Sequence, residues 1–317
     1  MNSISIIGAG AWGTALAIQA ARAGCRVTLW ARDPARIAAT RENPRLPGHR
    51  LPDAIRMTGT LPAGEMVLLA VPVQHVREIA ARLPAGGPVV VCAKGVEAGS
   101  LRLPLEILEE MLPGRAAAVL TGPNFAHEIA AGLPAASVVA AVDPALRAAV
   151  VAALATPGFR LYGNDDPVGA QVGGAAKNVV AIAAGAVIGA GLGENARAAL
   201  VTRGLAELSR LAVALGGRAE TVAGLSGLGD LLLTCTGASS RNYSFGFELG
   251  RGRLLEEILA GRSAVTEGVA TAPALVARAR QAGASLPICE AVAAVLTGRI
   301  TVRQAMEMLQ ARPLRDE

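Results

Sequence analysis

Short apolar runs alternate with helical periodicity through the first half of the chain. Apolar runs predict strands at 3–7, 26–30, 66–71, 89–92, 117–121 and 136–141, and residues 14–23 predict a helix. Strands that alternate with helices need crossover connections, which produce a mostly parallel sheet. Segment 41–52 carries three prolines and a glycine and is therefore predicted to be an ordered loop.

The second half has a different pattern, with no convincing strand after about residue 165. Apolar residues recur at helical spacing over 195–215, and Gly216 and Gly217 end that helix. Further helix starts are expected at three caps, which are Thr271 before Pro273, Ser285 before Pro287, and Thr301 in a capping box with Gln304. An α/β domain over 1–170 and an all-helical domain over 171–317 are predicted, with the cleft between them as the default site.

The composition is consistent with two domains and indicates how their cores are packed. The 317 residues suit two domains, and because 52% are hydrophobic but only 3% aromatic, the core must consist of small side chains that let helices approach closely. The uncharged segment 178–193 is glycine-rich and shorter than the ~20 residues of a membrane span, so a buried helix is expected.

No signal peptide or CxxC pair is recognised, which favours a cytoplasmic protein with reduced thiols. The three histidines are distant from the cysteines, so no metal site is expected. The net charge of +5 is scattered along the chain, which favours an ordinary solvated surface over nucleic-acid binding.

The clearest motif is the glycine turn GAGAWG at 8–13, between the first predicted strand and the first helix. Gly8 permits the tight turn, Gly10 lets the backbone approach a pyrophosphate, and Gly13 lets the helix pack on the strand. The backbone of Ala11 and Trp12 opens the helix, whose N-terminus offers N–H groups to phosphates. The first domain is therefore predicted to be a dinucleotide-binding domain of Rossmann type.

The end of the second strand bears on the choice of dinucleotide. An acidic residue there typically binds the ribose 2′-hydroxyl of NAD(H), but this chain has Ala31 followed by Arg32. An arginine can form a bidentate pair with a 2′-phosphate, so NADP(H) is expected to serve at least as well as NAD(H). The alternative is that Arg32 only stacks on the adenine.

Eight sequence blocks in order resemble the bacterial NAD(P)-dependent glycerol-3-phosphate dehydrogenases. They are GAGAWGTALA (8–17), LAVP (69–72), AKG (93–95), TGPNFA (121–126), KN (177–178), GLSGLGD (224–230), SRN (240–242) and EG (267–268). The resemblance implies a homodimer and reversible hydride transfer between NAD(P)H and dihydroxyacetone phosphate, a phosphorylated three-carbon substrate, for glycerophospholipid synthesis. It also implies a helical domain like the C-terminal domain of 6-phosphogluconate dehydrogenase.

The resemblance assigns the central chemistry to charged residues. Lys177 is implied as the acid/base at the reacting oxygen, which suits a lysine because the pKa of its ammonium shifts readily. Lys94 is implied as a contact of substrate and cofactor, and Asp230 as a substrate-site residue. The alternatives are solvated lysines and, for Asp230, a helix N-cap.

The remaining contacts are also implied by the resemblance. Substrate contacts are Gly122, Asn124, Ser240, Arg241 and Asn242, and cofactor contacts are Gly8, Gly10, Ala11, Trp12, Gly13, Arg32, His49, Lys94, Ala126, Arg241, Val265 and Glu267. The family commonly has serine where this chain has Asn124, and often serine where it has Ala11. A loop arginine and a surface glutamate are the plain alternatives for Arg241 and Glu267.

Two other functions stay open at this point. A 3-hydroxyacid dehydrogenase or a ketopantoate reductase has the same architecture, and a non-enzymatic NADP sensor needs no Lys177. Lys94 with Arg241 favours a phosphorylated substrate, because two cations suit a phosphate better than a single carboxylate.

Overall fold

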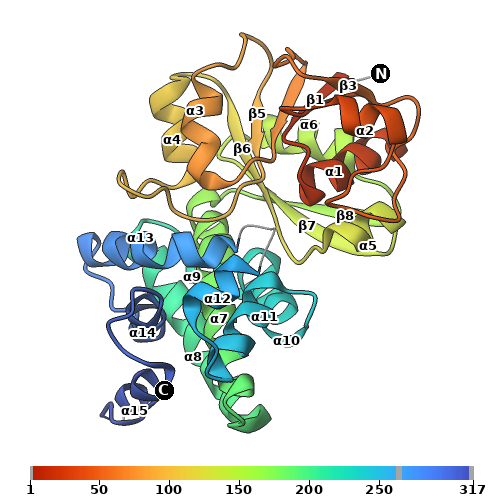
Figure 1. Ribbon diagram of the computed structural model, residues 1–317. Coiled ribbons are helices and arrows are strands. Elements are labelled where there is room, and N and C mark those ends of the chain that lie inside the picture. The colour runs from red at the N-terminus through yellow and green to blue at the C-terminus, as the bar shows by residue number, and fades with distance from the viewer. Residues whose placement is uncertain (1–2, 262–265, 314–317) are drawn as a thin grey trace. The chain divides into compact units, whose positions relative to one another are not determined.

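The computed structural model describes residues 3–261 and 266–313, which form two compact units (Figure 1). The first unit takes residues 1–94 and 102–171, and the second takes 95–101 and 172–317.

A sheet with the strand order β3-β2-β1-β4-β5-β6-β7-β8 forms the centre of the first unit. Only the β6–β7 pair is antiparallel among the described strands. Ile4, Ser5, Ile6 and Ile7 are all buried, so both faces of the central strand are covered. The strands are β1 Ser3–Ile7, β2 Arg26–Trp30, β3 Arg56–Thr58, β4 Met66–Leu69, β5 Val89–Val91, β6 Ala117–Thr121, β7 Ala135–Ala140 and β8 Phe159–Asn164.

Helices connect these strands, and α1 packs against α5. Arg22 near the end of α1 donates hydrogen bonds to the carbonyl oxygens of Ile129 (3.0 Å) and Ala130 (2.8 Å) in α5. Its positive charge thereby meets the negative end of the α5 dipole. The helices are α1 Ala11–Arg22, α2 Ala35–Thr40, α3 Val76–Ala80 after the short turn η1 Val73–His75, α4 Pro104–Met111, α5 Ala126–Ala131 and α6 Pro144–Leu154.

The six predicted strands are confirmed with small shifts at their ends, whereas β3 and β8 were not predicted. Both missed strands lie at the edges of the sheet. Because an edge strand faces solvent along part of its length, it does not need the apolar run that marks a central strand. In β8 only Phe159 is buried, and Tyr162 is exposed.

The second unit contains helices and no strand among its described residues. Its helices are α7 Pro167–Gly189, which starts in the first unit, α8 Gly193–Ala214, α9 Ala219–Ala223, the π-helical turn η2 Leu225–Gly229, α10 Asp230–Thr236, α11 Arg241–Gly250, α12 Leu255–Ala260, α13 Glu267–Gln281, α14 Pro287–Leu296 and α15 Val302–Gln310. Helix α7 is long and apolar enough to cross a membrane by length and composition alone, and 83% of its most apolar window is buried. It therefore has the burial of a core helix, as the sequence predicted.

Helices α7 and α11 are in backbone contact. A Cβ atom at Gly246 of α11 would lie 1.9 Å from the carbonyl oxygen of Ile182, and one at Gly185 of α7 would lie 2.0 Å from that of Tyr243. Gly189 and Gly250 continue the same contact four residues further along each helix. Four glycines thus let the two helices pack at a distance that no other residue permits, as the small-residue composition indicated.

One predicted helix start and one predicted cap are wrong. Helix α13 begins at Glu267 and continues through Pro273, so Thr271 lies inside the helix and is fully buried. Helix α14 does begin at Pro287, but its cap is not Ser285. The side chain of Glu207 in α8 accepts from the backbone N–H groups of Ile288 (2.7 Å) and Cys289 (3.3 Å), a cap that only the tertiary fold supplies. The Thr301–Gln304 capping box is confirmed.

The Glu207 cap places a titratable group inside the second unit. The side chain is 3% exposed, and burial raises its pKa from 4.5 to about 7, although the two N–H groups and the nearby Arg210 act in the opposite direction. Folding therefore retains a proton that the unfolded chain releases above its lower pKa.

We expect the free energy of unfolding to fall as pH rises from about 4.5 to about 7, by on the order of 3 kcal/mol, and then to level off. Glu207→Gln should abolish this fall, because an amide does not titrate. Denaturant unfolding across pH 5 to 8 measures it, with the exposed Glu307→Gln as the matched control. An unchanged pH dependence in Glu207→Gln contradicts the assignment.

Candidate active site

The glycine turn opens α1, and its three glycines have different reasons to be glycine. Gly8 has φ +113°, and a Cβ there would lie 2.8 Å from the Ala70 carbonyl oxygen. A Cβ at Gly13 would lie 1.9 Å from the carbonyl oxygen of Gly8. Gly10 has φ −76°, and its Cβ would meet nothing within 4 Å. The protein's own packing therefore explains Gly8 and Gly13, whereas Gly10 leaves space in front of the helix.

That space suits a phosphate group. Gly10 is the N-cap of a 12-residue helix, and no side chain caps it, so the N–H groups and positive dipole of its first turn can take an anion. The turn follows β1, which has β2 on one side and β4 on the other, so it lies where the strand order reverses. Dinucleotides bind at such a switch point, and the residues present therefore fit one.

Other predicted residues follow neighbouring strands at the same edge. Arg32 comes just after β2 and is exposed, while Ala31 is buried and leaves no carboxylate at that position. Lys94 follows β5, and Gly122 follows β6. Because β2, β1, β4, β5 and β6 are parallel, their carboxyl ends share one edge of the sheet.

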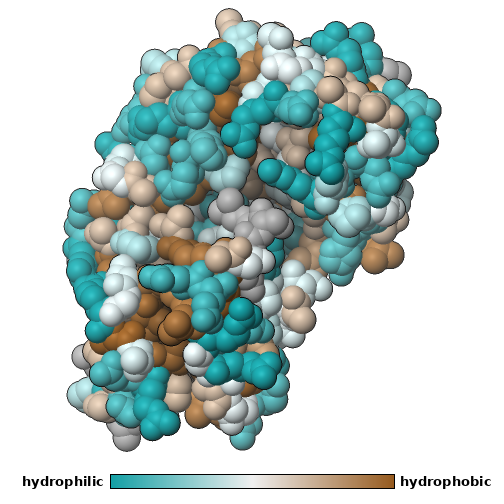
Figure 2. Space-filling view, in the orientation of Figure 1, coloured by the Kyte–Doolittle hydropathy of each residue, from teal (hydrophilic) through white to brown (hydrophobic). Residues whose placement is uncertain are grey.

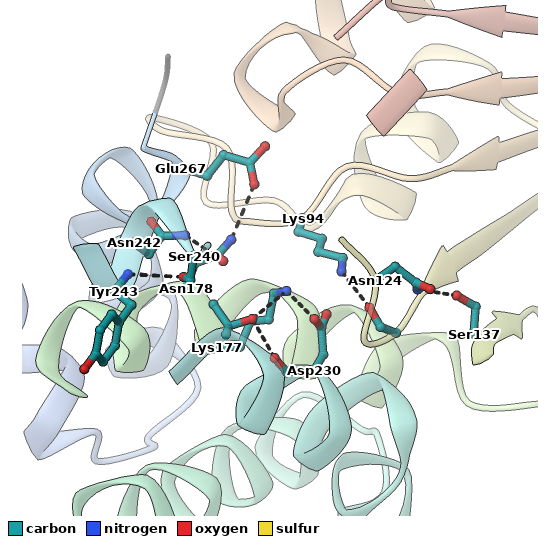
Figure 3. Close-up of polar contacts among 12 residues, drawn as sticks. Lys94, Asn124, Ser137, Lys177, Asn178, Asp230, Ser240, Asn242, Tyr243 and Glu267 are labelled. Carbon is teal, nitrogen blue, oxygen red and sulfur yellow. Dashed lines mark hydrogen bonds and ion pairs between the residues drawn. The ribbon is translucent and has the colours of Figure 1, made fainter. Parts of the chain in front are cut away.

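Lys94 and the Gly122 turn are in direct contact (Figure 3). The Lys94 ammonium donates to the Gly122 carbonyl oxygen at 3.2 Å. Gly122 has φ +144°, and a Cβ there would lie 3.0 Å from the Cα of Ser137, so the turn requires glycine. Asn124 Nδ2 donates to Ser137 Oγ at 2.5 Å, and its Oδ1 is buried without a partner among the described residues. That oxygen is able to accept from a ligand hydroxyl.

The remaining predicted residues of the first unit lie on α1, on α5 and on loop 41–52. Ala11 and Trp12 are partly buried in the first turn of α1, and Ala126 is the first residue of α5. His49 is half-buried on loop 41–52. His127, for which no role is predicted, is exposed and stacks on Phe125, with ring centroids 5.7 Å apart.

Lys177 is buried in the second unit, at the centre of an ion pair (Figure 3). Its side chain emerges from α7, and its ammonium pairs with Asp230 Oδ1 and donates to Thr234 Oγ1 at 3.1 Å. Lys177 is 7% exposed and Asp230 is fully buried. A buried ammonium held by a carboxylate and a hydroxyl has a fixed position, as a proton donor needs.

The local fold decides what Asp230 does. The π-helical turn η2 precedes it, so Asp230 is the first helical residue of α10 and Gly229 is the N-cap. The alternative that Asp230 is a helix N-cap is therefore wrong. Its carboxylate pairs with the Lys177 ammonium instead. Thr234 lies one turn later and donates to the Asp230 carbonyl oxygen at 2.6 Å. Cys235 is fully buried, and burial raises the pKa of its thiol to about 12, so it is a packing residue.

The Ser-Arg-Asn motif opens α11. Ser240 Oγ caps the helix by accepting from the Tyr243 N–H at 3.2 Å, and Arg241 is exposed. Asn242 is buried, and its Nδ2 donates to Asn178 Oδ1 at 2.9 Å while its Oδ1 accepts from the Gly268 N–H at 3.0 Å. Asn242 therefore joins α7, α11 and α13.

Asn178 makes a second contact with α13, since its Nδ2 donates to the Glu267 carboxylate at 3.4 Å (Figure 3). Val265, the other late residue expected to contact the cofactor, lies outside the described residues.

Three polar partners are not predicted from the sequence, namely Ser137, Asn178 and Thr234. Thr234 has a signal, because a position four residues after Asp230 shares its helix face. Asn178 stands in the KN block but received no role. Ser137 lies in a strand distant from Asn124 in sequence, and only the antiparallel β6–β7 pairing brings it near.

Both units are similar in sequence to known proteins. The N-terminal family profile of NAD-dependent glycerol-3-phosphate dehydrogenase matches residues 3–147, and the C-terminal profile matches residues 166–307. A glycerol-3-phosphate dehydrogenase, NAD(P)+, of Acidiphilium cryptum is 60% identical over 99% of this chain and 98% of its own length. One of Gluconobacter oxydans is 53% identical over 98% and 97%.

The fold of the chain is also similar to that of a solved structure. The crystal structure of glycerol-3-phosphate dehydrogenase from Coxiella burnetii has a TM-score of 0.93 and 36% identity, covering 98% of this chain and 99% of that one. With a profile match in each half and relatives that align end to end, this chain belongs to the NAD-dependent glycerol-3-phosphate dehydrogenase family.

Proposed function

We propose that this chain is an NAD(P)-dependent glycerol-3-phosphate dehydrogenase. It transfers hydride reversibly between NAD(P)H and dihydroxyacetone phosphate, giving sn-glycerol 3-phosphate. The observation that carries the proposal is the buried Lys177–Asp230–Thr234 set in a chain of this family.

Lys177 acts on the reacting oxygen. A dinucleotide held by the glycine turn would supply the hydride, and reduction of the ketone carbon would place negative charge on the ketone oxygen. The Lys177 ammonium stabilises that charge and delivers the proton, and in the oxidation direction the amine removes it. Asp230 balances the buried charge, and both Asp230 and Thr234 fix the direction of the ammonium.

Further substrate contacts are proposed within each unit. In the first, Lys94 and Gly122 form one contact and Asn124 offers an unpaired amide oxygen. In the second, Arg241 supplies a planar cation for the phosphate. Ser240 and Asn242 flank it, although their side chains also hold α11 in place.

The chain is proposed to divide into a dinucleotide-binding domain over 1–170 and a substrate-binding domain over 171–317, and most of the proposed cofactor contacts lie in the first. The main contacts are the glycine turn and Arg32, and the second unit adds Arg241 and Glu267. The others are Lys94, Ala11, Trp12, His49, Ala126 and Val265. A homodimer, a cytoplasmic location and a role in glycerophospholipid synthesis complete the proposal, and they rest on the family resemblance.

The substrate assay measures loss of NADPH absorbance. We expect turnover with dihydroxyacetone phosphate and none with ketopantoate. Lys177→Ala should lower kcat by about 100-fold or more, because it removes the proton donor, and should leave NADPH binding intact. Arg303→Ala, an exposed change on α15, is the control. Turnover of ketopantoate alone identifies the alternative reductase, absence of all turnover indicates a sensor, and full activity in Lys177→Ala contradicts the catalytic role.

A second assay tests the cofactor preference. If Arg32 pairs with the 2′-phosphate, Arg32→Ala should raise the KM for NADPH about ten-fold and leave that for NADH nearly unchanged. Arg26→Ala is a matched control, because Arg26 is exposed at the other end of the same strand. Equal rises for the two cofactors mean that Arg32 stacks on adenine, and an unchanged KM for NADPH contradicts the pairing.

A further inference from the structure

Asn43 is a buried polar residue outside the family blocks and outside every role assigned above. It lies on loop 41–52 and is 1% exposed. Its Nδ2 donates to the Ala9 carbonyl oxygen at 3.0 Å and to Thr14 Oγ1 at 2.6 Å. Its Oδ1 accepts from the Arg45 N–H at 3.0 Å. A carbonyl oxygen only accepts hydrogen bonds, so these contacts fix which end of the amide faces the turn.

The two atoms that Asn43 binds lie on either side of Gly10. Ala9 precedes it, and Thr14 closes the first hydrogen bond of α1, from its N–H to the Gly10 carbonyl oxygen at 3.0 Å. In a trans peptide the C=O and the following N–H point in opposite directions. Since the Ala9 carbonyl is held toward Asn43, the Gly10 N–H must point the other way.

That N–H has no acceptor within residues 3–261 and 266–313. It belongs to the glycine whose Cβ position is open, at the helix N-terminus. The loop behind Asn43 is itself held in place. Leu46 and Leu51 are buried in the core, and the Arg41 guanidinium donates to the Ile55 carbonyl oxygen at 3.1 Å. Asn43 therefore connects a fixed loop to the glycine turn at 8–13.

We propose that Asn43 is a positioning residue that orients the Ala9–Gly10 peptide so that the Gly10 N–H is aimed at the dinucleotide pyrophosphate. This rests on the proposed function, because it takes the glycine turn as the pyrophosphate site. Asn43 acts through the turn and does not touch the cofactor, so its loss weakens dinucleotide binding without impairing the chemical step.

The test is Asn43→Asp in the full-length enzyme. The new side chain has the same size, but at neutral pH it presents only acceptors to the Ala9 carbonyl oxygen, which turns that carbonyl away. We expect the KM for NADPH and the Kd for NADP+ to rise about ten-fold. The kcat at saturating NADPH and the KM for dihydroxyacetone phosphate should stay within about two-fold of wild type.

A pH readout separates positioning from general support of the fold. At acidic pH the introduced carboxyl becomes protonated and can donate again, so the loss of NADP+ affinity relative to wild type should shrink between pH 8 and pH 5.5. The control is Glu42→Ala, which removes the 2.7 Å bond from the Gly48 N–H in the same loop and leaves the Asn43 amide alone. Its KM for NADPH should remain at the wild-type value.

Gly10→Ala distinguishes failure of this proposal from failure of the proposed function. Its Cβ fills the ligand's space and meets no protein atom, so it should weaken NADP+ binding without lowering stability. If Gly10→Ala binds normally, the turn is not the pyrophosphate site and both proposals are overturned. If Gly10→Ala loses affinity while Asn43→Asp keeps it, only the Asn43 role is overturned. Should Asn43→Asp not fold, Asn43→Ala replaces it with the same expected KM values and the same contradicting result.

Discussion

The backbone contact between α7 and α11 is the constraint on which the second unit depends. Gly185 and Gly189 of one helix face Gly246 and Gly250 of the other, and an added Cβ at any of them would lie 1.9–2.2 Å from a backbone oxygen. Lys177 and Asn178 lie about two turns before these glycines in α7, and Ser240, Arg241 and Asn242 lie just before them in α11. Once the helices are in contact, the Asn178–Asn242 hydrogen bond follows from the geometry.

A second constraint operates in the first unit, where one edge of the sheet brings together predicted site residues that are far apart in the sequence. Parallel strands bring the glycine turn, Arg32, Lys94 and Gly122 to their common carboxyl edge. The antiparallel strand β7 then brings Ser137 to Asn124, and loop 41–52 brings Asn43 to the turn. The backbone geometry of the sheet edge thus positions the proposed ligand contacts, and buried side chains such as Ser137 and Asn43 stabilise that geometry.

Much of this could be predicted from the sequence. Central strands have apolar runs because both faces are buried, and the glycine turn has a spacing that its mechanics require. The edge strands β3 and β8 could not be predicted in this way, because a strand that is partly exposed to solvent does not need an apolar run. Pro273 suggests a helix start, but α13 begins at Glu267. Ser285 suggests a cap for α14, but Glu207, which is distant in sequence, supplies it. Local patterns carry no information on such partners, and the roles of Asn43 and Ser137 depend on them too.

The most direct test of the close helix contact is the thermal unfolding of Gly246→Ala beside Gly261→Ala. The added methyl of Gly246→Ala collides with the Ile182 carbonyl oxygen, whereas at Gly261 a Cβ meets its nearest atom at 3.5 Å. We expect the midpoint of Gly246→Ala to fall by about 4 °C or more and its kcat to fall as well, while Gly261→Ala stays near wild type. A wild-type midpoint and kcat in Gly246→Ala would contradict this expectation.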